Sequence, residues 1–124
     1  KAVQIGVSAW TAEALKQTLS ASIFSRSTEC HNQDKVSMGT IAARDASRVI
    51  VLTEQVIAAL CCASVQAIHL KGLDGKLAEV LAAFKTWVLQ TFDYVVEDRP
   101  LQHELQQLVD RLENLELLSS ELVR

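Results

Sequence analysis

The sequence predicts an all-α protein built as a bundle of long helices, and three observations lead to this prediction. Hydrophobic residues make up 49% of the 124 residues, whereas aromatic residues make up only 5%. One proline and four glycines leave long stretches without the residues that most disfavour a helix. Apolar side chains also recur every three to four residues, as on one face of a helix. This length and composition indicate a single helical region over residues 1–124.

The first expected helix covers residues 2–19, where Val3, Val7, Trp10 and Ala14 follow the helical period. The next stretch, residues 20–35, is rich in serine and threonine and breaks this period. Because such residues favour turns, we expect a loop there.

A long second helix is expected over residues 36–71. Asp34 or Ser37 would cap its start, and Gly72 and Gly75 would end it. At about 1.5 Å per residue it would be roughly 50 Å long, whereas a compact domain of this size has a radius of gyration of about 14 Å. The helix is therefore expected to extend beyond its own domain.

The centre of this helix, Val49 to Ile68, is apolar on nearly every side. A helix of this kind is usually buried all round. The rest of the chain can cover only part of it, so we expect partner helices, from further sequence or from other subunits, to cover the remainder.

A third helix is expected over residues 76–95, and a fourth after Pro100, which suits the first helical position. Leucines recur along the fourth helix in alternating steps of four and three residues, with Ser119 as the one polar member. This seam predicts a coiled-coil-like contact. Its leucines are Leu101, Leu105, Leu108, Leu112, Leu115 and Leu122.

Charge and hydropathy exclude several classes of function. The net charge is −3 and no basic stripe is present, which argues against binding to nucleic acid. The longest uncharged stretch, Gln55 to Leu70, is shorter than the roughly 20 apolar residues that span a bilayer. No signal-peptide pattern opens the chain. We therefore expect a cytoplasmic protein that does not enter a membrane.

The cysteines and histidines predict no metal site. Cys61 and Cys62 are adjacent in the apolar helix, and Cys30 stands alone, so reduced thiols are expected. No C-x-x-C is present, and the three histidines lie far apart in the sequence. His69 and His103 are interpreted as structural residues on helices.

A polar cluster at residues 29–34, E-C-H-N-Q-D, precedes the long helix. A helix N-terminus carries partial positive charge and free N–H donors, which suits an anionic ligand group. Asn32 and Gln33 offer neutral donors and acceptors, and Glu29 offers a base or a partner for an ammonium group. Adjacent Cys30 and His31 would point apart in an extended loop, which argues against a Cys-His nucleophile. The residues alone fit a solvated turn and an active-site loop equally well.

The run T-E-C-H-N-Q-D-K-V-S-M-G-T-I-A-A-R at residues 28–44 resembles the aromatic amino acid ammonia-lyases, the family of histidine, phenylalanine and tyrosine lyases and related aminomutases. Two further stretches resemble the family: Q-A-I-H-L-K at residues 66–71, where His69 replaces the usual Asp, and E-D-R-P-L at residues 97–101.

The resemblance implies an all-helical homotetramer that eliminates ammonia from an aromatic amino acid to give an aryl acrylate. The family's electrophile is a methylidene-imidazolone prosthetic group made from an internal Ala-Ser-Gly, a tripeptide absent from this sequence. Tyr94, the only tyrosine, does not match the family's catalytic tyrosines. The chain also opens on Lys1 rather than Met. We therefore expect the C-terminal part of a longer lyase, inactive on its own.

Four residues of the loop carry over from the family's motif. Glu29 matches an acidic residue near the substrate amine, and is the candidate catalytic residue. Asn32, Gln33 and His31 match the family's H-N-Q-D, and are the candidate substrate-binding residues. Gln33 stands where histidine lyases have Glu, which favours phenylalanine or tyrosine over histidine. Cys30 departs from the family pattern.

Two alternatives remain open at this stage. An aminomutase of the same family would add the ammonia back to the β-carbon. A non-catalytic helical oligomerisation module would share the leucine seam and the extended helix without chemistry.

Overall fold

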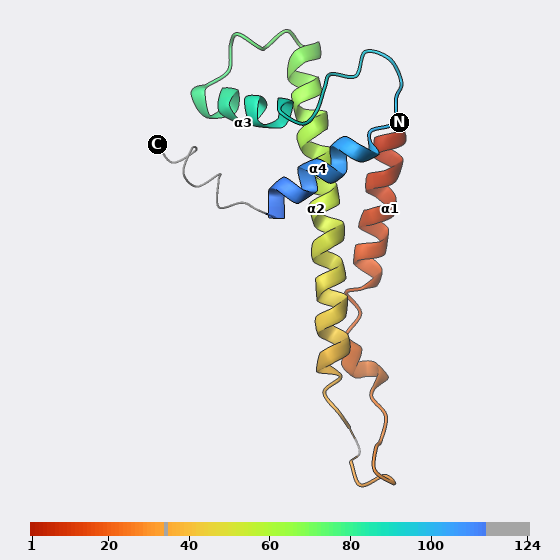
Figure 1. Cartoon of the computed structure of the whole chain (residues 1–124). Coiled ribbons are helices and arrows are strands. Elements are labelled where there is room, and N and C mark those ends of the chain that lie inside the picture. The colour runs from red at the N-terminus through yellow and green to blue at the C-terminus, as the bar shows by residue number, and fades with distance from the viewer. Residues whose placement is uncertain (34, 114–124) are drawn as a thin grey trace. The chain divides into compact units, whose positions relative to one another are not determined.

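The all-α prediction is confirmed by a computed structural model, which describes residues 1–33 and 35–113. Four α-helices and one short 3-10 helix make up its regular structure, and no strand occurs within these residues (Figure 1). Asp34 and three positions of the leucine seam, 115, 119 and 122, lie outside the described residues. The elements are α1 (Ala2–Lys16), η1 (Ala21–Phe24), α2 (Gly39–Leu70), α3 (Glu79–Leu89) and α4 (Gln102–Glu113).

The chain divides into two compact units, Lys1–Thr53 and Glu54–Arg124, and α2 contributes residues to both. In the first unit, α1 and the first part of α2 run in opposite directions (Figure 1). Glu13 on α1 pairs with Arg48 on α2, with 2.7 Å between a guanidinium nitrogen and a carboxylate oxygen. Along α1, which is described in full, no residue is buried.

The second unit holds the main hydrophobic core. Its buried residues come from the second half of α2, from α3 and the segment after it, and from α4. Leu108 of the seam is fully buried, and Leu101, Leu105 and Leu112 pack against the core. The described part of the leucine seam therefore faces this core. The core residues are Ala58, Cys61, Cys62, Val65, Val88, Phe92, Leu108 and Val109.

The apolar centre of α2 is covered on only part of its circumference in this chain. Leu52 and Ala58 are fully buried, whereas Ile50 is 58% and Leu60 63% exposed. By length and composition α2 would also suffice to cross a membrane, which the uncharged stretch 55–70 alone did not predict. The reason is that the apolar window extends beyond that stretch and contains few charges. A core helix of a soluble protein has the same length and composition, so these properties do not separate the two.

The two ends of α2 are set by residues in left-handed backbone conformations. The helix begins at Gly39 rather than at residue 36, because Met38 has a φ of 55° and cannot continue a right-handed helix. The Met38 carbonyl accepts the first helical hydrogen bond from the Ala42 amide at 3.0 Å. Ser37 therefore does not occupy the N-cap position.

The expected glycine stop at the other end is present as a Schellman motif. Gly72 has a φ of 62°. Its amide donates to the His69 carbonyl at 3.0 Å, and the Leu73 amide donates to the Ile68 carbonyl at 3.1 Å. These two bonds satisfy carbonyls that the end of the helix leaves unpaired.

The third helix is shorter than the expected span of residues 76–95, and ends at Leu89. Gln66 on α2 explains part of the difference. Its side-chain Oε1 accepts a hydrogen bond from the Val95 amide at 2.9 Å, and its Nε2 donates to the Val95 carbonyl at 3.3 Å. The Gln66 side chain thus bonds the N–H and the C=O of Val95, two groups that would have made helical hydrogen bonds if α3 had continued to residue 95.

Arg111 ties α4 to the end of α3. Its guanidinium donates to the Trp87 carbonyl at 2.8 Å, to Thr91 Oγ1 at 2.6 Å and to Gln90 Oε1 at 2.7 Å. It also lies 4.5 Å from the centroid of the Trp87 ring. A cation at the last carbonyls of a helix is stabilised by the negative end of the helix dipole.

We predict that Arg111→Met lowers the free energy of unfolding of the second unit by about 2 kcal/mol, since several hydrogen bonds from a charged donor and a cation–π contact are lost. Chemical denaturation followed by Trp87 fluorescence in a Trp10→Phe background measures this change. Arg48→Met is the matched control, because its exposed ion pair contributes less than about 1 kcal/mol. Equal effects of the two substitutions would contradict the assignment.

The three cysteines differ sharply in environment. Cys30 is exposed in the loop before α2, whereas Cys61 and Cys62 are buried in the core. Burial raises the pKa of both core thiols, and raises that of Cys62 to about 12. Because the thiolate is the reactive form, both effects suppress reaction at neutral or mildly alkaline pH.

We predict that a thiol reagent at pH 8 modifies Cys30 in the folded chain and leaves Cys61 and Cys62 unmodified, and that all three react after unfolding. Mass spectrometry of the alkylated chain measures this, with Cys30→Ser as the control that should abolish native-state labelling. Rapid labelling of Cys61 or Cys62 under native conditions would show that the core is not packed as described.

Candidate functional site

The segment between η1 and α2 forms a hairpin that closes at Thr28 and Gln33. The Thr28 amide donates to the Gln33 carbonyl at 2.9 Å, and the Gln33 amide donates to the Thr28 carbonyl at 3.2 Å. Between them, the Asn32 amide donates to the Glu29 carbonyl at 3.0 Å. The sequence cluster at residues 29–32 is therefore the tip of a tight turn, held at its base by a two-way backbone pair.

The tip has an unusual backbone, because Glu29, Cys30 and His31 are all left-handed, with φ values of 51°, 54° and 68°. None of them is glycine, so the left-handed conformation of each is roughly 1–2 kcal/mol higher in free energy than a right-handed one. A run of such residues persists only where surrounding bonds over-determine it, and strained backbone gathers at functional sites. The hairpin bonds at Thr28 and Gln33 supply that constraint here.

Hydroxyl groups on the incoming arm of the hairpin hold two of the candidate side chains. Thr28 Oγ1 donates to Gln33 Oε1 at 2.9 Å. Ser27 Oγ lies 2.7 Å from His31 Nδ1. Sequence reasoning read Ser27 and Thr28 only as turn formers. The signal that could have identified them is their place directly before the cluster, four and five residues from His31 and Gln33 across a turn.

The base of the hairpin is anchored to the chain on either side. The Val36 amide donates to Ser25 Oγ at 2.9 Å, and both residues are partly buried. Arg26 donates to the carbonyls of Phe24 and Ser25 at 3.2 and 3.0 Å. These bonds hold the two arms of the hairpin together below its Thr28–Gln33 pair.

The structure brings Glu29, His31, Asn32 and Gln33 together on this one turn, and leaves all four exposed. A carboxylate, an imidazole and two primary amides are therefore presented side by side, with neutral donors next to an anion. Such a set can bind an ammonium group together with an acceptor oxygen. Within the described residues no cluster of His, Cys, Asp or Glu could hold a metal ion.

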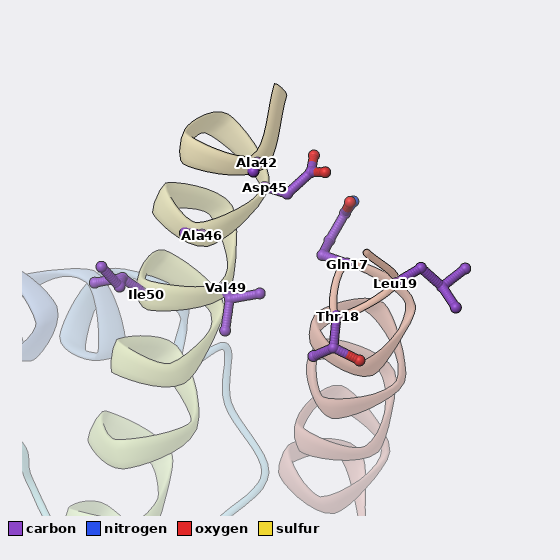
Figure 2. Close-up of a pocket in the computed structure, with 8 residues that line it drawn as sticks. All are labelled: Gln17, Thr18, Leu19, Ala42, Asp45, Ala46, Val49 and Ile50. Atoms are coloured by element: carbon purple, nitrogen blue, oxygen red, sulfur yellow. The ribbon is translucent and has the colours of Figure 1, made fainter. Parts of the chain in front are cut away.

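A second candidate lies between the end of α1 and the start of α2, where a groove of about 410 Å³ opens (Figure 2). Its walls are mostly apolar, and Gln17 and Asp45 project toward the same side of the gap. Sequence analysis assigned none of these residues to a site, because the periodic pattern does not show where two helices leave a gap between them. The groove is lined by Gln17, Thr18, Leu19, Ala42, Asp45, Ala46, Val49 and Ile50.

The two helical histidines make ordinary structural contacts. The His69 ring stacks on Tyr94 with 3.9 Å between centroids, and its Nδ1 lies 3.5 Å from Asp74 Oδ2. Lys85 also bonds Asp74, and this hydrogen bond lowers the pKa of the Asp74 carboxyl. His103 Nε2 lies 2.8 Å from Gln107 Nε2, one turn away on α4.

Comparison with known proteins places these observations in a family. The family model for aromatic amino acid lyases matches residues 1–88. A histidine ammonia-lyase of Bacillus subtilis is 31% identical over 98 residues, which are 79% of this chain and 19% of that enzyme. A tyrosine ammonia-lyase of Cereibacter sphaeroides is 36% identical over 118 residues, 88% of this chain and 21% of that enzyme. No solved structure matches the chain.

The chain spans about a fifth of the length of these two relatives. Since the family model covers most of the chain, including α1, the hairpin and all of α2, the protein belongs to the aromatic amino acid lyase family.

Proposed function

We propose that this chain is the C-terminal part of an ammonia-lyase that eliminates ammonia from an aromatic amino acid to give an aryl acrylate. The observation that carries the proposal is the hairpin, which gathers Glu29, His31, Asn32 and Gln33 on one strained turn. Family membership supplies the class of reaction. In the complete enzyme, this turn would form one wall of the active site, and the rest of the site would come from sequence outside these 124 residues.

We further propose phenylalanine or tyrosine as the substrate. Relatives of this chain include lyases named for histidine and for tyrosine, so the choice of ring rests on Gln33. A neutral amide at this position suits a neutral aryl ring, whereas a carboxylate would attract a protonated imidazole.

The roles of the hairpin residues follow from their chemistry. The Glu29 carboxylate can bind the substrate ammonium group and accept a proton during elimination. Asn32 and Gln33 carry amide donors for carboxylate or phenol oxygens, and His31 is held at Nδ1 by Ser27, which leaves Nε2 on the far side of its ring. Elimination breaks the bond between the α-carbon and nitrogen and removes a β-proton, so ammonia and an acrylate are the products.

The family's prosthetic group would be a methylidene-imidazolone, which supplies an electrophile to the substrate when present. This sequence has no Ala-Ser-Gly precursor, so the group would belong to another part of the enzyme. The residues of the hairpin are compatible with such a neighbour, because the neutral amides of Asn32 and Gln33 can pair with a ring carbonyl. No metal is required by this proposal.

We propose a cytoplasmic homotetramer as the working state. The support is α2, on which Ile50 and Leu60 are large, apolar and more than half exposed in the single chain. Ile57, which lies between them in the helix, is 41% exposed. Large exposed apolar side chains along one helix favour a protein interface. The same surface would serve a non-catalytic oligomerisation module, so the test of function must separate chemistry from assembly.

We predict that Gln33→Ala in the complete enzyme lowers kcat/KM for the preferred aromatic substrate by about 10- to 100-fold, the cost of losing a hydrogen bond to a charged or polarised oxygen. Gln33→Glu should shift preference toward histidine. Steady-state kinetics on phenylalanine, tyrosine and histidine measures both effects, and analytical ultracentrifugation should show an unchanged oligomer.

Gln102→Glu on α4 is the matched control, since this exposed glutamine lies outside the hairpin. It should leave turnover and substrate preference unchanged. Full turnover by Gln33→Ala with a broken oligomer would contradict the catalytic proposal, and would favour the oligomerisation module.

A further inference from the structure

We propose that Thr28 is a positioning residue that fixes the orientation of the Gln33 carboxamide, so that Gln33 meets the substrate as a hydrogen-bond donor. This inference rests on the function proposed above, because it assigns the polarity of one contact in that site. Thr28 lies outside the H-N-Q-D cluster, and acts only through Gln33.

The backbone pairing brings the two side chains together. Thr28 and Gln33 exchange both backbone hydrogen bonds, at 2.9 and 3.2 Å, so they face each other directly. Residues paired in this way place their side chains on the same face of the two arms. The 2.9 Å contact between Thr28 Oγ1 and Gln33 Oε1 is the result.

The direction of this hydrogen bond decides which end of the amide is left for a ligand. A glutamine Oε1 carries no hydrogen, so the Thr28 hydroxyl must be the donor. The Gln33 NH₂ group then lies at the opposite end of the amide, with two donors. It would therefore recognise an acceptor oxygen, such as a substrate carboxylate or phenol oxygen, rather than an N–H group.

Holding the amide in advance also favours binding. A free glutamine side chain loses rotamer freedom when it binds a ligand, at a cost equivalent to about tenfold in affinity. In this hairpin the exposed Gln33 side chain is already tied to Thr28. Without the Thr28 hydroxyl, the Gln33 side chain would lose its rotamer freedom only when the substrate binds, which weakens binding. The Gln33 amide could then also turn its oxygen, instead of its NH₂ group, toward the substrate.

The test uses the complete lyase and three variants. Thr28→Val keeps the shape and removes the hydroxyl, and Thr28→Ser keeps the hydroxyl. Thr86→Val is the matched control, because the Thr86 hydroxyl bonds the Ala82 carbonyl of its own helix and lies outside the hairpin. We expect kcat/KM to fall about tenfold in Thr28→Val, to stay within about twofold in Thr28→Ser, and to be unchanged in Thr86→Val.

A double variant separates positioning from a merely structural role. If Thr28 acts through Gln33, Thr28→Val adds no further loss to Gln33→Ala. A full additional loss in the double variant would overturn the inference, because it would show that Thr28 supports the hairpin rather than the amide. Wild-type kinetics in Thr28→Val alone would overturn it as well.

A second measurement keeps this inference distinct from the proposed function. In the 124-residue chain, ¹⁵N relaxation of the Gln33 side-chain amide should show greater mobility in Thr28→Val than in the parent chain or in Thr28→Ser. If the complete enzyme eliminates no ammonia but this difference is seen, the proposed function fails and the positioning holds. Equal mobility in all three chains would overturn the positioning whatever the activity.

Discussion

The length and apolar character of α2 constrain the rest of the molecule. One continuous helix, Gly39–Leu70, contributes residues to both compact units and supplies half of the buried core of the second. Its apolar circumference exceeds what α3 and α4 cover, and large side chains such as Leu60 stay exposed. A helix with this surface is stable in water only when further helices pack on it. The homotetramer proposed above would supply such helices.

The start of α2 also decides the conformation of the candidate site. Met38 has a positive φ, so the helix cannot extend back toward the hairpin, and the intervening residues must satisfy their polar groups by other means. The Val36 amide does so by donating to Ser25 Oγ, and the hairpin itself is closed by the Thr28–Gln33 backbone pair. The strained tip thus results from closing a tight turn with residues other than glycine.

The helical period and the glycine stop at Gly72 predicted the fold class and the end of α2 correctly. Helix boundaries that depend on tertiary contacts were not predictable: α3 ends early where Gln66 pairs with Val95, a contact between residues far apart in sequence. For the site, the motif located the polar turn, but its left-handed backbone and the bonds from Ser27 and Thr28 arise from closure geometry. The groove beside Asp45 lay outside any periodic signal.

Elimination of ammonia from an aromatic amino acid is the reaction proposed for the enzyme to which this chain belongs. The most direct measurement is to incubate the complete enzyme separately with phenylalanine, tyrosine and histidine, and to quantify the acrylate and the ammonia released. We expect equal amounts of aryl acrylate and ammonia from phenylalanine or tyrosine, with histidine the poorest substrate. A β-amino acid as the main product, or no acrylate from any of the three, would contradict it.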